Sequence, residues 1–134
     1  MLNENKEIRM KWEKNDEYNY RVKTGMIIIG IAQVMDEIKN MTTKREPNDK
    51  AKQIMITHKN MLYSVKTPIR YKQSREYFLN CINKYIEGIK MLNLGINDND
   101  AKIIYKAGLL IKAGNAWMEL TKIQIHFEIG DITN

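Results

Sequence analysis

The sequence predicts an all-α protein that folds as a compact antiparallel bundle of four to five helices. Apolar residues recur at helical spacings in several segments, and only two prolines, Pro47 and Pro68, interrupt the chain. The one stretch with strong β propensity, residues 26–31, has no partner strand elsewhere in the sequence. The length of 134 residues fits one domain, so we expect residues 1–134 to form a single helical domain.

The clearest helix is expected to begin at Pro68, with Thr67 as its N-cap, and to end near Gly95. Gly95 is predicted to take the left-handed conformation that terminates many helices. Apolar residues in this segment step by 7, 4, 3, 4 and 3, which places them on one helix face. These residues are Tyr71, Phe78, Ile82, Tyr85, Ile89 and Leu92.

A long C-terminal helix is expected over about residues 98–128. Short polar residues at positions 97–100 can cap its start, and the negative charge there suits the positive end of the helix dipole. Its middle is apolar on nearly every side, so several neighbours are needed to cover it. The sequence therefore predicts a highly buried C-terminal helix, the most buried in the fold.

The first half of the chain supplies the remaining helices. One is expected from Asn48 or Asp49 to about Val65, and another over residues 26–41, where apolar residues step by 4, 3, 4 and 3. Residues 5–23 carry a thinner stripe, and they either continue into 26–41 as one long helix or form a separate helix broken at residues 24–25. Residues 1–23 are thus a candidate N-terminal arm or dimerisation helix.

Positive charge is concentrated in the middle of the chain. Residues 39–90 carry 12 basic and 4 acidic side chains, whereas the segments before and after each have a net charge of −1. A basic face over residues 50–75 is one hypothesis for nucleic-acid binding, because arginine and lysine pair with phosphate. The candidate residues are Lys59, Lys66, Arg70, Lys72 and Arg75.

The sequence offers no catalytic residue, no metal site and no cofactor motif. A di-iron site in a bundle needs a Glu-x-x-His motif on two helices, but Met55 and Ile123 stand three residues before His58 and His126. Phosphate-binding glycine motifs are absent. Cys81 is expected on the core side of its helix, where a thiol behaves as a small hydrophobe. We therefore expect a protein that is not an enzyme.

The first functional hypothesis is an interaction protein, either homo-oligomeric or bound to another macromolecule, and nucleic-acid binding by residues 50–75 is the alternative. The expected interface residues are Ile8, Trp12, Tyr18 and Val22. Their stripe is thin, so we expect it to have too little apolar surface to pack against its own chain and to dock onto a partner instead. The polar N-terminal segment does not read as a signal peptide, and residues 26–32 are too short to span a membrane. With a lone cysteine, these features suggest a cytoplasmic protein.

Overall fold

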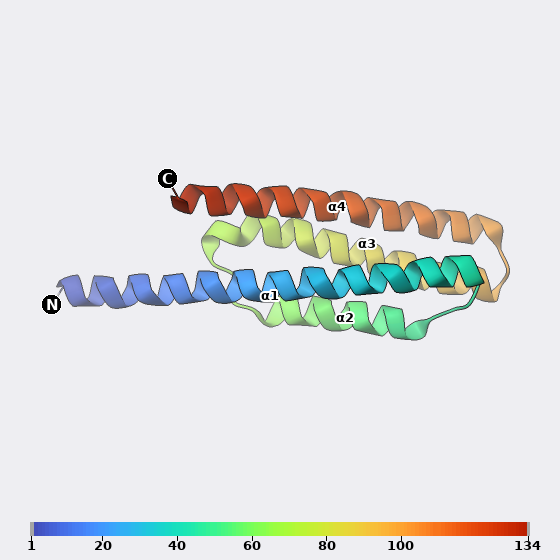
Figure 1. Ribbon diagram of the computed structural model, residues 1–134, viewed down its shortest axis with the longest axis horizontal. Coiled ribbons are helices and arrows are strands. Elements are labelled where there is room, and N and C mark those ends of the chain that lie inside the picture. Colours follow the sequence, from blue (N-terminus) through green and yellow to red (C-terminus); the bar gives the residue numbers. More distant parts are fainter. Residues whose placement is uncertain (1, 134) are drawn as a thin grey trace.

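Four α-helices account for most of the described chain. The computed structural model describes the backbone of residues 2–133 and the side chains of residues 15–130. The helices are α1 (Leu2–Lys44), α2 (Asp49–Ser64), α3 (Lys72–Asn97) and α4 (Ala101–Thr133), with a 3₁₀ turn, η1 (Ile69–Tyr71), before α3. Successive helices run in opposite directions (Figure 1), and residues 2–133 contain no strand. The predicted all-α antiparallel bundle is confirmed.

The first helix is a single unbroken element. It spans 43 residues, so residues 5–23 and 26–41 belong to one helix rather than two. Its first turns extend past the ends of the other helices (Figure 1). In the described chain, no helix combines the length and apolarity that a membrane crossing requires.

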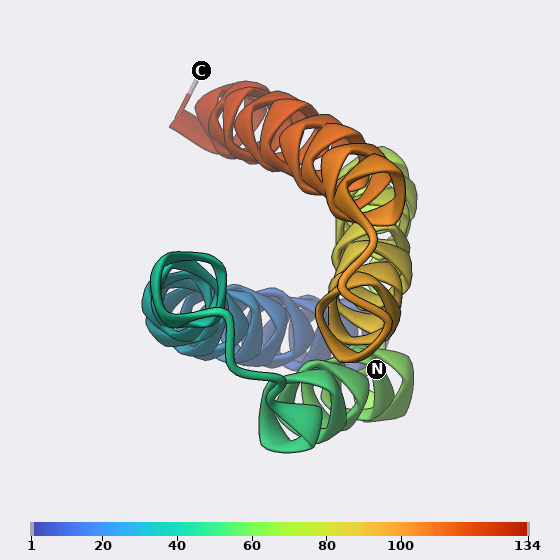
Figure 2. The ribbon, with the colours of Figure 1, turned by 90° about the vertical axis from the view of Figure 1, so that its right-hand side faces the viewer.

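The helices lie along an arc in chain order when viewed end-on, with α3 between α2 and α4 (Figure 2). The most extensive packing is between α3 and α4. All six residues of the predicted α3 stripe are at most 2% exposed, so α3 is the central helix of the core. Stacking of the Tyr20 and Tyr71 rings, with centroids 5.0 Å apart, joins α1 to η1 beside α3.

The predicted caps form at the starts of α2 and α4. The Asn48 side-chain oxygen accepts a hydrogen bond from the Ala51 N–H (3.2 Å). The Asp100 carboxylate accepts from the N–H groups of Lys102 (3.0 Å) and Ile103 (3.3 Å). Because the first turn of a helix leaves its N–H groups without backbone partners, these side chains determine where each helix begins.

The start of α3 differs from the prediction. Pro68 leads into η1, whose Tyr71 N–H donates to the Pro68 carbonyl at 2.9 Å, and the α-helical bonding begins only at Lys72. The Thr67 hydroxyl bonds to the Val65 carbonyl at 3.5 Å and caps nothing. The predicted cap would have accepted from the N–H of Ile69 or Arg70. The structure instead closes a 3₁₀ turn through the N–H of Tyr71.

The predicted role of Gly95 is also wrong. The left-handed residue after α3 is Asn99, with φ of 50°, whereas Gly95 has no positive φ and lies within the helix. A Cβ on Gly95 would come within 2.8 Å of the Ile104 side chain and 2.9 Å of its backbone nitrogen. The absence of a side chain at Gly95 therefore lets the start of α4 pack closely against the end of α3.

The predicted C-terminal helix is present, but it is less buried than expected. One face packs on α3 through residues such as Ala107, Gly114 and Met118. The opposite face is open to solvent, because α4 lies at the end of the arc and has only one close neighbour among the described helices. Its all-round apolar character is therefore not explained by packing within one chain.

Candidate interaction surfaces

An apolar row lies on the outward side of α1. This α1 row consists of Tyr18, Val22, Met26 and Ile29, whose exposed fractions are 62, 42, 51 and 63%. Steps of 4, 4 and 3 residues keep the four side chains on one helix face. A surface helix usually turns polar residues toward water, so this face is unusual.

Two of the predicted interface residues, Tyr18 and Val22, belong to the α1 row. Met26 and Ile29 were not predicted, because residues 26–31 are apolar throughout and periodicity alone does not separate their inner and outer members. The side chains of Ile8 and Trp12 lie outside the described residues, although both positions are within α1.

A second apolar row, longer than the first, follows the outward side of α4. This α4 row consists of Tyr105, Leu109, Leu120, Ile123 and Phe127, which are 69, 49, 46, 65 and 66% exposed. The exposed residues Lys112 and Ala116 continue the same helical spacing between Leu109 and Leu120. In the sequence, this surface is visible only as apolar residues on nearly every side of the helix. That pattern led to the prediction of a buried helix and not of an exposed apolar face.

The predicted basic residues gather where α2 ends and α3 begins, but two of them pair with acidic residues of α1. The Lys66 ammonium lies 3.0 Å from the Asp16 carboxylate, and the Arg70 guanidinium lies 3.4 Å from that of Glu17. These acidic residues are some fifty positions earlier in the chain, so local charge counts could not reveal the pairing. The basic face therefore carries less free charge than the sequence indicates.

Two of the other three predicted cations lie beside a tyrosine. The Lys59 ammonium and the Arg75 guanidinium lie 6.0 and 5.4 Å from the centre of the Tyr63 ring. Lys72 is exposed. The structure thus brings Lys59 and Arg75 together around Tyr63, whereas Lys66 and Arg70 lie beside α1.

A buried polar cluster lies where α1, η1, α3 and α4 meet. Glu128 is 4% exposed, and neither of its carboxylate oxygens has a well-aligned hydrogen-bond partner, although polar groups of Ser74 and Gln124 lie nearby. The hydroxyls of Tyr20 and Tyr71 and the Nε atom of Arg75 are likewise buried without such a partner. Buried polar atoms without a well-aligned hydrogen bond cost free energy, which sets this cluster apart from the surrounding apolar core.

Burial also shifts the acidities in this cluster. It raises the pKa of Glu128, and nearby polar groups of Ser74 and Gln124 only partly oppose the rise. Burial likewise raises the pKa values of Tyr20 and Tyr71. The cluster therefore favours a neutral Glu128 carboxyl and neutral phenols.

Cys81 is buried and His58 is half-buried. Burial raises the pKa of Cys81 to about 12, which disfavours the nucleophilic thiolate. Burial lowers the pKa of His58, whose Nδ1 has no hydrogen-bond partner and whose ring faces Gly30 of α1. Their chemical roles are those of packing residues at the core and its edge.

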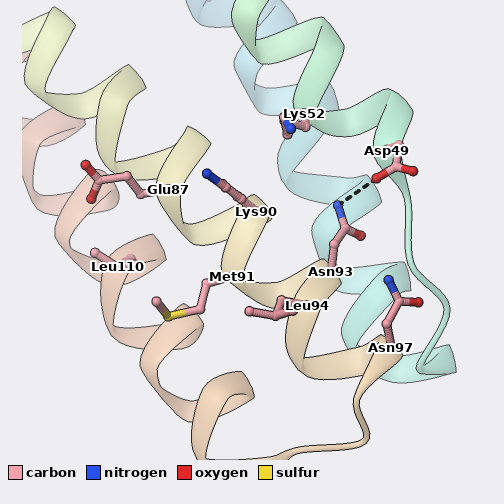
Figure 3. Close-up of a pocket in the computed structure, with 9 residues that line it drawn as sticks. All are labelled: Asp49, Lys52, Glu87, Lys90, Met91, Asn93, Leu94, Asn97 and Leu110. Carbon is pink, nitrogen blue, oxygen red and sulfur yellow. Dashed lines mark hydrogen bonds between the residues drawn. The ribbon is translucent and has the colours of Figure 1, made fainter.

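A hollow of about 550 Å³ lies between α2, α3 and α4 (Figure 3). Its lining combines apolar side chains with two acidic and two basic ones: Asp49, Lys52, Glu87, Lys90, Met91, Asn93, Leu94, Asn97 and Leu110. The Asn93 amide donates to Asp49 at 3.5 Å, so part of the lining is used to join α3 to α2. The balanced charges give no preference for a charged ligand.

Among the residues whose side chains are described, no group of three or more acidic, histidine or cysteine side chains could hold a metal ion. The chain matches no protein-family model, no curated protein and no solved structure.

Proposed function

We propose that the protein is a non-enzymatic interaction protein that acts by association through apolar helix faces, and first of all by binding a second copy of itself. The observation that carries this proposal is that both outer helices, α1 and α4, turn a row of large apolar side chains toward solvent. Apolar surface gathered in one place marks an interaction site more often than scattered apolar residues do.

The location of the reactive groups supports a non-enzymatic role. A catalytic group must be within reach of a substrate, yet Cys81 is fully buried and Glu128 is 4% exposed. The acidity of Cys81 is also shifted away from the reactive thiolate form. The exposed surface is distinguished by apolar area and not by reactive chemistry.

Nucleic-acid binding through residues 50–75 is the less favoured alternative, because Lys66 and Arg70 are paired with carboxylates of α1. Its test is the affinity for duplex and single-stranded DNA over a salt series. Phosphate contacts make affinity fall steeply with salt, and replacing both Arg70 and Lys72 by Glu would weaken binding by about tenfold or more. Affinity that is unchanged by these replacements excludes this face.

The proposed function is tested by sedimentation velocity of the full chain between about 1 and 200 µM, the range in which micromolar association is detected. We expect a reversible increase in mass with concentration, reaching twice the mass of one chain. A second series at raised salt separates apolar from electrostatic association, because only the latter is strongly screened. A chain that stays monomeric throughout contradicts the proposal.

A further inference from the structure

We infer that the α4 row is the seam of a two-fold dimer in which α4 packs antiparallel against α4 of a second copy. This inference rests on the proposed function and names both the partner and the surface. The axis of the dimer passes beside Ala116, which is exposed and lies at the middle of the row.

Four of the five residues of the row are placed symmetrically about Ala116, and the fifth, Leu120, stands 4 residues after it, opposite Lys112 of the other copy. Tyr105 precedes it by 11 residues and Phe127 follows it by 11, while Leu109 and Ile123 stand 7 residues before and after it. In two antiparallel helices related by a two-fold axis, positions equally far before and after the axis lie opposite each other. Near each end of the seam, Tyr105 of one copy therefore faces Phe127 of the other. About one helical turn closer to the axis, Leu109 of one copy faces Ile123 of the other.

The centre of the row allows close approach. Ala116 has the smallest side chain on this face of α4, and two helices whose contact residues are small can bring their axes to about 8 Å. Larger side chains lie on either side of it, so each helix has a shape that fits a reversed copy of itself. A different partner would not require this symmetry, and for this reason the second copy is the occupant that the row favours.

Charge agrees with the same register. Lys112 stands 4 residues before Ala116 and Glu119 stands 3 after it, so the register brings Lys112 of one copy beside Glu119 of the other. Both positions lie on the same flank of the row, since on a helical wheel they are about 20° apart. The two-fold axis generates this pair twice. In the single chain, Glu119 makes only an exposed contact with Lys122 at 3.6 Å, which leaves it free to exchange partners.

The first test is sedimentation velocity of the double variant Leu109→Glu/Ile123→Glu, with Tyr18→Glu/Val22→Glu in the α1 row as the matched control. All four residues are at least 42% exposed, so none of these changes disturbs the core. We expect the α4 variant to raise the dimer dissociation constant by at least about tenfold and the α1 variant to leave it unchanged.

The second test is a charge exchange. Lys112→Glu and Glu119→Lys should each weaken the dimer, because each places like charges side by side, and the double exchange should restore it. A third test is oxidation of Ala116→Cys, which should yield a covalent dimer since the two sulfurs meet at the axis. Its control is Ala101→Cys, also exposed, which lies 15 residues and about 22 Å along the helix from the axis.

The outcomes separate the two proposals. If the wild-type chain is monomeric, the proposed self-association fails and the dimer seam fails with it. If the wild-type chain dimerises but the α1 variant dissociates it, or if both cysteine variants cross-link equally, the proposed function stands and the α4 seam is overturned. Dissociation by the α4 variant with rescue by the charge exchange supports the seam and its register.

Discussion

The ring of Tyr85 in α3 lies directly against Gly114 in α4. A Cβ on Gly114 would come within 2.6 Å of two carbon atoms of that ring, and Tyr85 is 2% exposed. The Tyr85 hydroxyl also donates a 2.5 Å hydrogen bond to the side chain of Asn115. Because the ring is enclosed and anchored at its hydroxyl, Gly114 determines how closely α3 and α4 pack.

Replacing Gly114 with alanine is therefore expected to destabilise the fold by about 1–3 kcal/mol, since the methyl group overpacks the contact. This loss should outweigh the gain of about 1 kcal/mol that alanine normally brings to a helix interior. Urea unfolding followed by circular dichroism measures the difference. Gly108→Ala is the control, because nothing lies within 4 Å of that position and the variant should gain stability. Equal stabilisation of both variants would contradict the close contact.

Glu128 is expected to make stability fall as pH rises. Its folded-state pKa is raised by burial, so its contribution is fully present below the unfolded pKa and is lost as pH rises through the folded value. Glu128→Gln removes the titration and should stabilise the protein at pH 7 by about 1–3 kcal/mol, with little effect near pH 4. Thermal unfolding over this pH range checks the prediction. If the stability of wild type and of Glu128→Gln changed with pH in the same way, the prediction would be wrong, because the folded protein would then stabilise the charged carboxylate as well as water does.

His58 is expected to have the opposite effect on the acid side. Burial lowers its folded-state pKa below the usual value near 6.5, so the unfolded chain takes up a proton more readily and stability falls as pH drops below that value. His58→Leu removes the titration and should flatten the profile between about pH 5 and 7. The measurement is the free energy of unfolding at half-unit intervals. A variant that keeps the wild-type slope would assign the acid sensitivity to other groups.

Helix positions and the core of α3 could be predicted from the sequence because they depend on local signals. Periodicity identified the α3 stripe, and short polar residues identified the starts of α2 and α4. Gly95 was misinterpreted, since a glycine at a helix end can either terminate it or admit a neighbouring helix. Only the position of Ile104 in the next helix decides between these roles.

The candidate surfaces were less predictable because they depend on which helices become neighbours. The pairing of Lys66 with Asp16 joins residues 50 positions apart, and local charge counts do not include it. The apolarity of α4 indicated burial, and a single sequence does not say whether its own chain or another copy provides the cover. The end position of α4 in the arc leaves its outer face open.

Asn93, near the C-terminal end of α3, is bonded to the connection between α1 and α2. Its side-chain oxygen accepts a 2.7 Å hydrogen bond from the Asn48 N–H, and its amide donates to the Asn48 carbonyl at 3.4 Å and to Asp49 at 3.5 Å. Asn93→Leu keeps the approximate volume but leaves both backbone groups unpaired, so we expect a loss of about 1–3 kcal/mol in the free energy of unfolding.

Asn93→Asp tests the two halves of this interaction separately. The aspartate can still accept from the Asn48 N–H but cannot donate, and its charge lies beside the Asp49 carboxylate. The variant should be less stable than wild type at pH 7 and should recover part of the loss near pH 4, where the introduced carboxylate begins to take up a proton. Urea unfolding at both pH values is the measurement. A leucine variant within about 0.5 kcal/mol of wild type, the range of an ordinary surface change, would mean that Asn93 does not hold this connection in place.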